Sequence, residues 1–180
     1  MLDLLAEVVR ALNARRVPHA LIGAGAMAVH GVARSTQDLD LLTSDPAVLA
    51  PSFWIELGGR GASVDPRRGD DEDPLAGVVR IESPGQRAVD VVVGKRPWTG
   101  DVLARARPAS AGGVVVPVAQ AADLVLLKLF AGGPQDAWDV EQLLAAGDRE
   151  VIAARVEERL ADLPAESSAM WRRVRGGGGG

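Results

Sequence analysis

The sequence predicts an α+β fold in which a mixed sheet of about five strands is flanked by helices and followed by a helical C-terminal part. Two observations support this prediction. Short β-branched runs bounded by Gly and Pro recur as far as residue 118, and from residue 119 the apolar residues follow helical spacing. A 180-residue chain of this kind suits one domain with a helical appendix. We therefore expect a core at 1–118, helices packed on it at 119–175, and a flexible glycine tail at 176–180.

Composition excludes several classes of protein. The chain has no cysteine, so disulfides, zinc thiolates and cysteine nucleophiles are ruled out. A formal net charge of -4 argues against a nonspecific nucleic-acid coat protein. No apolar run approaches the ~20 residues of a membrane span, and the acidic, helical N-terminus does not resemble a signal peptide. We expect a soluble cytoplasmic protein without a membrane partner.

The N-terminal elements follow from periodicity and from Gly and Pro positions. Apolar residues at helical spacing predict a helix over 2–16, which Pro18 ends before a short buried strand at 19–22. Gly23 and Gly25 then bracket a tight turn that opens a short helix at 26–30. Residues 37–42 form the next strand, and a capped helix starts after Pro46.

The middle and C-terminal elements are predicted in the same way. Residues 58–74 are rich in Gly, Pro and charge, which predicts an exposed loop. Two β-branched runs at 77–82 and 88–93 flank a turn at 83–86 and predict a hairpin, and 114–118 is a further strand. Helices are expected at 119–131, 134–146, 149–161 and 165–174.

Two aspartates one residue apart, Asp38 and Asp40, stand out in the strand at 37–42. Residues i and i+2 of a strand point to the same side, so their carboxylates repel each other. Asp90 lies among valines in the strand at 88–93 and is costly to bury unpaired. If the strands are adjacent, the three carboxylates can hold two Mg²⁺ ions roughly 4 Å apart, the geometry of in-line phosphoryl displacement.

Ordinary structural roles are the alternatives to this metal site. Asp38 and Asp40 could mark a strand end that faces solvent, and Asp90 could pair across strands with Arg80 or Arg87. The turn at Gly23 favours the functional interpretation, because backbone amides at a strand-to-helix turn suit a triphosphate.

The order of these residues resembles the minimal nucleotidyltransferase superfamily, which has the polymerase-β-like fold, and most closely the AbiEii/AbiGii toxin-type nucleotidyltransferases. Those proteins read hydrophobic-Gly-Gly, then His-Gly, then Arg-x-Thr-x-Asp-x-Asp, and later a Lys followed by an Asp-x-x-Asp helix. The matching elements here span roughly residues 15–146: Ile22-Gly23-Ala24, His30-Gly31, Arg34-Ser-Thr36-Gln-Asp38-Leu-Asp40, Asp90, Lys128, and Asp136 with Asp139.

The resemblance implies a mechanism at the carboxylates. Asp38 and Asp40 would hold the Mg²⁺ that chelates the β- and γ-phosphates of a nucleoside triphosphate (NTP), and Asp38, Asp40 and Asp90 together would hold a second ion. That ion activates an acceptor hydroxyl, Asp90 can receive the proton, and the hydroxyl attacks the α-phosphate and expels pyrophosphate.

The resemblance also implies the nucleotide contacts. Gly23 and Ala24 would cradle phosphate through their backbone N–H groups, and Lys128, with Arg34 as a weaker candidate, would neutralise the triphosphate. Asp136 and Asp139 share one helix face and could orient Lys128 or touch the base. Each of these residues also has an ordinary structural alternative. Lys128 could extend its ammonium to solvent along an apolar helix, and the two aspartates could form a helix N-cap and an exposed helix face.

The sequence departs from the family pattern at two positions that would contribute to nucleotide binding. Ala24 stands where the family usually has Gly or Ser, which removes a hydroxyl that can contact phosphate. Gly132-Gly133 stands where relatives commonly place an arginine, which removes a cation.

The departures leave three hypotheses for function. The first is a toxin that modifies tRNA or a protein and is paired with an antitoxin. The second is an enzyme that modifies a small hydroxylated compound of the antibiotic type. The third is a non-catalytic domain that binds a nucleotide or a partner.

Overall fold

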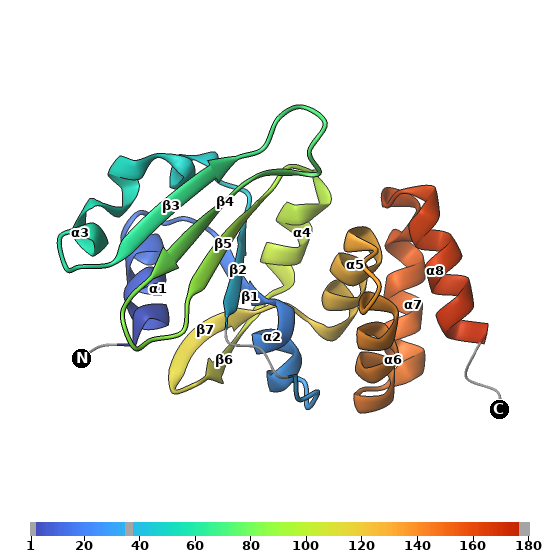
Figure 1. The fold of residues 1–180 in the computed structure, drawn as a ribbon. Helices are drawn as coiled ribbons and strands as arrows, with labels where there is room; N and C mark the ends of the chain where they lie inside the picture. Colours follow the sequence, from blue (N-terminus) through green and yellow to red (C-terminus); the bar gives the residue numbers. More distant parts are fainter. Residues whose placement is uncertain (1–2, 35–37, 177–180) are drawn as a thin grey trace.

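The computed structural model describes residues 3–34 and 38–176, and its centre is one mixed seven-stranded sheet (Figure 1). The strand order is β3-β4-β5-β2-β1-β7-β6. Neighbouring strands pair antiparallel except β2 with β5 and β1 with β7, which are parallel. The strands are β1 (His19–Ile22), β2 (Leu39–Thr43), β3 (Ser63–Arg68), β4 (Leu75–Glu82), β5 (Val89–Gly94), β6 (Arg107–Ala111) and β7 (Val114–Val118).

Helices flank the sheet and form the C-terminal part, as the fold class predicted. The α-helices are α1 (Leu4–Ala14), α2 (Gly23–Val29), α3 (Ile55–Gly58), α4 (Trp98–Arg105), α5 (Ala121–Ala131), α6 (Asp136–Ala146), α7 (Arg149–Arg159) and α8 (Ala165–Gly176). Short 3₁₀ segments are η1 (Pro46–Leu49), η2 (Pro51–Trp54) and η3 (Leu160–Asp162). Gly176, expected in the tail, is the last residue of α8, and the remainder of the tail lies outside the described residues.

The five predicted strands correspond to β1, β2, β4, β5 and β7, and the hairpin prediction is confirmed by β4 pairing with β5. Residue 37, the expected start of β2, lies outside the described residues. The prediction of a loop over 58–74 is wrong for 63–68, which form β3, and β6 was also missed.

Both missed strands are the edges of the sheet, which explains why their composition is not strand-like. An edge strand can carry charge and proline because one side of its backbone needs no partner. Pro66 lies within β3 and Pro108 within β6, and β3 is mostly exposed. These segments become strands because the edges of β4 and β7 provide backbone hydrogen-bond partners for them. Local sequence does not reveal that such a partner is present.

Helix α4 was missed as well, and the helix expected after Pro46 is replaced by η1, η2 and the single turn of α3. Gly100 weakens the helical pattern of α4, although Pro97 immediately before it is a helix-start signal. Asp45 caps η1 by accepting a hydrogen bond from the Ala47 N–H at 2.9 Å.

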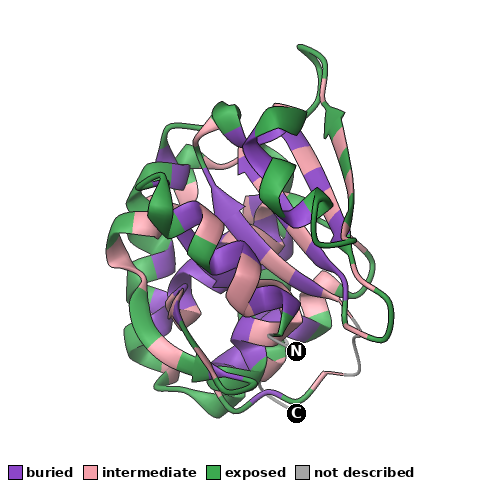
Figure 2. Ribbon diagram, turned by 90° about the vertical axis from the view of Figure 1, so that its left-hand side faces the viewer, coloured by how far each residue is buried: buried purple, intermediate pink, exposed green. Residues whose placement is uncertain are grey.

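The two faces of the central strands differ in burial (Figure 2). Val79, Val91 and Leu41 lie on one face and are fully buried. Helix α1 and the η1–α3 segment pack on this side (Figure 1). Alternate residues of β4 and β5 face the other way and are half-buried, so the second face is partly open.

Helices α5 to α8 pack together beside this open face (Figure 1). Helix α5 is apolar nearly all round, which is typical of a helix covered on several sides. The Ser167 hydroxyl of α8 donates a hydrogen bond to the Leu129 carbonyl of α5 at 2.9 Å, which fixes the last helix to the first of the group.

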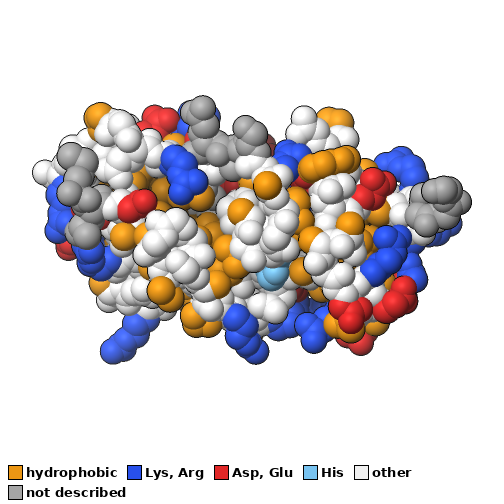
Figure 3. All heavy atoms as spheres, turned by 90° about the horizontal axis from the view of Figure 1, so that it is seen from below, with side chains coloured by type: hydrophobic (Ala, Val, Ile, Leu, Met, Phe, Trp, Pro, Cys, Tyr) orange, Lys and Arg blue, Asp and Glu red, His pale blue; other side chains and the backbone are white. Residues whose placement is uncertain are grey.

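Acidic, basic and apolar side chains are interspersed over the described surface seen from below (Figure 3). Among the described residues, no helix is both long and apolar enough to cross a membrane.

The burial pattern makes a prediction about stability. Val91 in β5 is fully buried, whereas Val115 in β7 is 69% exposed. We expect Val91→Ala to lower the free energy of unfolding by about 1.5–3 kcal/mol, because it removes buried methyl groups and leaves a cavity. Val115→Ala is the matched control and should change it by less than about 0.5 kcal/mol. Urea denaturation measures both, and equal losses would contradict the assignment of faces.

Candidate active site

The strand register places charged residues side by side in one row across the open face of the sheet. Asp40 of β2 lies opposite Asp90 of β5, Asp90 lies opposite Arg80 of β4, and Arg80 lies opposite Asp65 of β3. Neighbouring strands of a sheet lie about 4.7–4.9 Å apart, so residues paired across them are close together. The two aspartates that the sequence singled out on separate strands are therefore immediate neighbours.

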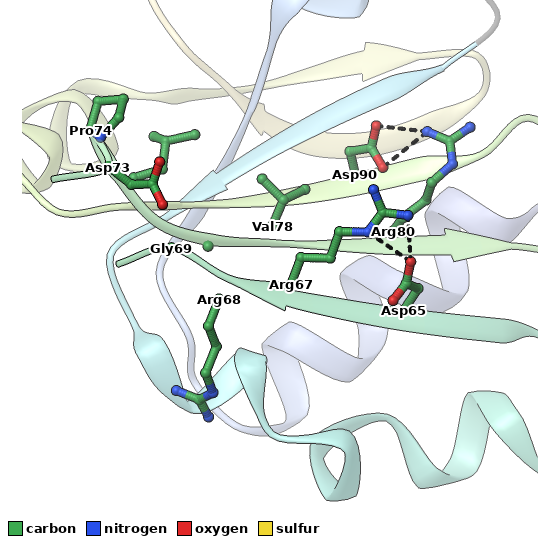
Figure 4. A pocket seen from close by; sticks show the side chains of 11 residues that line it. Asp65, Arg67, Arg68, Gly69, Asp73, Pro74, Val78, Arg80 and Asp90 are labelled. Atoms are coloured by element: carbon green, nitrogen blue, oxygen red, sulfur yellow. Dashed lines mark hydrogen bonds and ion pairs between the residues drawn. The ribbon is translucent and has the colours of Figure 1, made fainter. Parts of the chain in front are cut away.

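Within this row, Arg80 pairs with Asp90 (Figure 4), and it also contacts two acidic residues outside the row, Asp38 and Glu82. Its Nη1 donates to Asp90 Oδ1 at 3.2 Å and to Oδ2 at 3.0 Å, and also to Asp38 Oδ2 at 3.2 Å. Its Nη2 lies 3.3 Å from the same Asp38 oxygen, and its Nε lies 3.0 Å from Glu82 Oε1. Asp90 therefore forms the ion pair with Arg80 that was the structural alternative, and it also lies opposite Asp40 on the neighbouring strand.

Burial, and after it the repulsion between the carboxylates, raises the pKa values of Asp40 and Asp90. Burial raises the pKa of Asp40 to about 6, with further contributions from the charges of Asp90 and Asp38, while Lys128 and Arg80 oppose the change. Burial likewise raises the pKa of Asp90, although the charge of Arg80 opposes it. A group of carboxylates with raised pKa values is one that a further cation would stabilise.

Gly23 makes the close approach of the β1–α2 turn to Asp40 possible. Its φ of +59° lies in the left-handed region, and a Cβ there would lie 2.2 Å from Asp40 Oδ2. Helix α2 begins at Gly23 itself, earlier than the expected start at residue 26, so Ala24 lies in its first turn. Ile22, which pairs with Asp40, ends β1 in an extended conformation.

Lys128 of α5 belongs to a second charged cluster at the mouth of the site. Its Nζ lies 2.8 Å from Asp136 Oδ1 and 2.8 Å from Asp139 Oδ2. Burial by itself would lower the pKa of Lys128, but the hydrogen bonds to Asp136 and Asp139 outweigh it and raise the pKa. The ammonium is therefore charged at neutral pH, and the two aspartates of α6 orient it.

Arg34 completes this cluster from the other side. Its Nη1 lies 2.8 Å from Asp139 Oδ1, its Nη2 donates to Gln135 Oε1 at 3.1 Å, and its guanidinium lies over the Trp138 ring at 5.5 Å. Asp139 has only 1% of its side chain exposed, so it needs the two cations to be buried as an anion.

The glycines that depart from the family pattern have local structural roles. Gly132 ends α5 in the left-handed conformation with φ +65°, as helix C-caps commonly do. The Gly133 N–H donates to Asp136 Oδ2 at 2.7 Å, and a Cβ on Gly133 would lie 2.9 Å from that oxygen. The Gly132-Gly133 pair therefore helps to hold the aspartate that orients Lys128.

Two cavities meet at the aspartate row. One of about 420 Å³ is lined by Gly23, Asp40 and Lys128, by apolar side chains from α4, α5 and the sheet, and by Lys95 and Arg96 before α4. The other, of about 460 Å³, contains Asp90 and Arg80 and extends over β3 and β4 (Figure 4). Pro74 and Leu75 line both cavities. Asp40 and Asp90 thus stand between two spaces that are each large enough for a small molecule.

Sequence reasoning missed part of the cavity wall. Trp98 and Thr99 of the unpredicted α4 line the smaller cavity, and Pro74 belongs to the segment expected to be a loop. The local signals for that helix were the proline before it and the helical spacing of Trp98 and Val102.

The donor set suits Mg²⁺ in kind, because carboxylate oxygens are its preferred protein ligands. In the described ranges 3–34 and 38–176, no three Asp, Glu or His side chains converge as a ready-made metal cluster. Two of the candidate ligands, Asp38 and Asp90, instead contact the guanidinium of Arg80. Asp38, Asp40 and Asp90 therefore offer donor atoms of the kind that a divalent ion prefers, but an arginine contacts two of them and the three side chains are not gathered around one point.

Comparison with solved structures identifies the fold. The solution structure of the antibiotic-resistance factor ANT(2'')-Ia matches with a TM-score of 0.53 and 14% identity, over 88% of this chain and 91% of that one. A nucleotidyltransferase-like protein from Paracoccidioides brasiliensis matches with a TM-score of 0.53 and 15% identity, over 93% of this chain and 90% of that one.

A crystal structure of ANT(2'')-Ia in complex with adenylyl-2''-tobramycin gives a TM-score of 0.53 and 14% identity, over 87% of this chain and 97% of that one. No family model matches the sequence, and no curated protein matches it significantly. The chain has the nucleotidyltransferase fold.

The raised pKa of Asp40 predicts how stability depends on pH. The folded protein keeps the Asp40 proton up to about pH 6, whereas the unfolded chain loses it near the ordinary value of 3.8. Stability is therefore lost as pH rises from about 4 through 6, and the loss is complete above that range. In EDTA at pH 7.5, we expect Asp40→Asn to raise the free energy of unfolding by about 1–3 kcal/mol.

Thermal unfolding at pH 7.5 and pH 4 measures this effect. The Tm advantage of Asp40→Asn over the wild type should be about 2–4 °C for each kcal/mol and should shrink at pH 4, where Asp40 is protonated in the folded protein and already partly protonated in the unfolded chain. A Tm difference that is unchanged between the two pH values would contradict the prediction.

The close approach at Gly23 predicts a specific intolerance of side chains. Gly31 has a similar positive φ of +85°, but a Cβ there would meet none of the described residues within 4 Å. Gly31→Ala is therefore a matched control for backbone strain, which costs about 1–2 kcal/mol. We expect Gly23→Ala to destabilise more than Gly31→Ala, because its Cβ also displaces the Asp40 carboxylate. Chemical denaturation measures both, and equal effects would contradict the contact.

Proposed function

We propose that this chain is a divalent-metal-dependent nucleotidyltransferase that moves a nucleoside monophosphate from an NTP to a hydroxyl acceptor. One observation carries the proposal: Asp40 and Asp90 are direct neighbours on parallel strands, between a cavity that ends at Lys128 and a second cavity beside Arg80. The nucleotidyltransferase fold supports this assignment of chemistry to the row.

The residues divide into two groups in the proposed reaction. Asp38, Asp40 and Asp90 would hold Mg²⁺, two ions in the full complex, and the metal supplies Lewis-acid polarisation of phosphate and acceptor oxygens when bound. Lys128 places a fixed positive charge in the smaller cavity, where it would bind the triphosphate. Gly23 and Ala24 would offer backbone N–H groups to the same phosphates.

The bond changes are those of a simple displacement. The acceptor oxygen bonds to the α-phosphorus, the bond between the α-phosphorus and the bridging oxygen breaks, and pyrophosphate leaves. Asp90 would take the hydroxyl proton, a role that suits a carboxylate whose pKa is raised by burial. Arg34 would act through Asp139, since its guanidinium is held by Asp139 and Gln135.

We propose tRNA or a protein as the acceptor, with the chain acting as the toxin-like component of a toxin–antitoxin pair. The order of motifs from Gly23 to Asp139 supports this proposal through its resemblance to AbiEii-type proteins. A small hydroxylated compound is the second candidate acceptor. It is favoured by the 460 Å³ cavity beside Asp90, a size typical of small-molecule sites.

The proposed chemistry predicts a labelling result. The protein, incubated with Mg²⁺ and each α-labelled NTP, should transfer label to an acceptor, and Asp40→Asn or Asp90→Asn should reduce transfer at least about 100-fold. Asp101→Asn removes an exposed carboxylate that pairs with Arg159 and is the matched control, with activity retained. Equal transfer by Asp40→Asn and the wild type would refute the role of the row.

The same experiment separates the acceptors. Reactions contain total tRNA, a protein extract or an aminoglycoside mixture, and products are resolved by gel and by thin-layer chromatography. Label on RNA or on protein supports the macromolecular acceptor, and label on the small compound supports the alternative. No transfer to any of them, together with no NTP binding by calorimetry, would exclude the enzyme.

A further inference from the structure

Arg80 holds the ligands that the proposed metal needs. Its Nη1 contacts Oδ2 of both Asp38 and Asp90, at 3.2 Å and 3.0 Å. Hydrogen bonds of this kind use the lone pairs with which a carboxylate binds a metal ion. A divalent ion that takes both oxygens competes with the guanidinium for them, and two cations in contact with the same carboxylates repel each other.

The surroundings of Arg80 allow it to move. Its side chain is 34% exposed, and it lines the 460 Å³ cavity rather than the packed core. On the side away from Asp90, the neighbouring strand places Asp65, which already pairs with Arg67, directly opposite it, and Glu82 already accepts its Nε. Arg80 can thus leave Asp38 and Asp90 and still keep carboxylate partners.

We propose that Arg80 is a built-in counter-cation that holds the aspartate site in a metal-free resting state and withdraws into the larger cavity when a divalent ion binds. This inference rests on the proposed function, since it concerns the same aspartates. Arg80 is a positioning residue in this scheme: it determines how tightly the metal binds and how the empty site keeps its carboxylates together.

One consequence is that metal affinity without nucleotide is low. The ion has to displace Arg80 as well as shed water, and the phosphates of an NTP supply the additional ligands that favour the exchange. Withdrawal also brings the guanidinium into the cavity that we assign to the acceptor. Metal loading and the charge of the acceptor cavity are coupled in this way through one side chain.

Manganese titration of the folded chain without nucleotide tests the proposal. Free Mn²⁺ is counted by electron paramagnetic resonance for the wild type, Arg80→Gln and Arg67→Gln. Arg67 lies in the same cavity and pairs with Asp65, so its loss controls for a general change in charge. We expect Arg80→Gln to bind Mn²⁺ at least about tenfold more tightly than the wild type, and Arg67→Gln to differ by less than about threefold.

A second variant and a second readout keep the test decisive. The gain should disappear in Arg80→Gln/Asp40→Asn, which places it at the aspartates. If Arg80→Gln does not fold, Arg80→Met is used, because it keeps an apolar stem without the charge. In EDTA the Arg80 variants should have a lower Tm than the wild type, and added Mn²⁺ should raise their Tm more than it raises that of the wild type.

The outcomes distinguish this inference from the proposed function. Equal or weaker Mn²⁺ binding by both Arg80 variants overturns the resting-state role, whether or not the wild type transfers label from NTP. Tighter binding by Arg67→Gln of the same size also overturns it, because the effect would then be general charge. Label transfer by the wild type tests the proposed function separately, so either one can fail alone.

Discussion

The direct pairing of Asp40 with Asp90 across the parallel strands β2 and β5 is the constraint on which the rest of the site depends. Two carboxylates held at adjacent positions repel each other, and partial burial makes the repulsion stronger. The fold surrounds them with compensation: Arg80 approaches from β4, Lys128 approaches from α5, and Asp40 keeps a raised pKa. The sheet can hold these neighbouring carboxylates because positively charged side chains approach them from β4 on one side and from α5 on the other.

A second buried charge connects the C-terminal helices to this row. Asp139 of α6 is almost completely buried and is neutralised by Lys128 from α5 and by Arg34 from the segment before β2. A buried anion with two cationic partners has few acceptable geometries, so it fixes the positions of the consecutive helices α5 and α6 relative to the segment before β2, which is distant in the sequence. The direction of Lys128 toward the smaller cavity is a result of this arrangement, and Gly133 contributes by holding Asp136.

The edge of the sheet gives the site its second cavity. Strand β3 continues the sheet beyond β4, and the segment that joins them places Pro74 and Leu75 between the two cavities. Solved nucleotidyltransferase folds share the overall arrangement at 14–15% identity, so they establish the fold and not the substrate. Charged side chains of both signs, Arg67, Arg80 and Asp65, line this second cavity.

The sequence by itself was sufficient to predict the inner strands, the hairpin and which charged residues are candidates for the site. These features rest on local rules: β-branched runs between turn residues, helical spacing, and an aspartate that is out of place among valines. The edge strands β3 and β6 were decided only by the tertiary structure, because a charged, proline-containing segment becomes a strand when a neighbour offers its ladder. The contact of Arg80 with both Asp38 and Asp90, and the burial of Asp139, were decided in the same way. Both depend on strand register and helix packing, which bring together charges that are up to 105 residues apart in the chain, as Arg34 and Asp139 are.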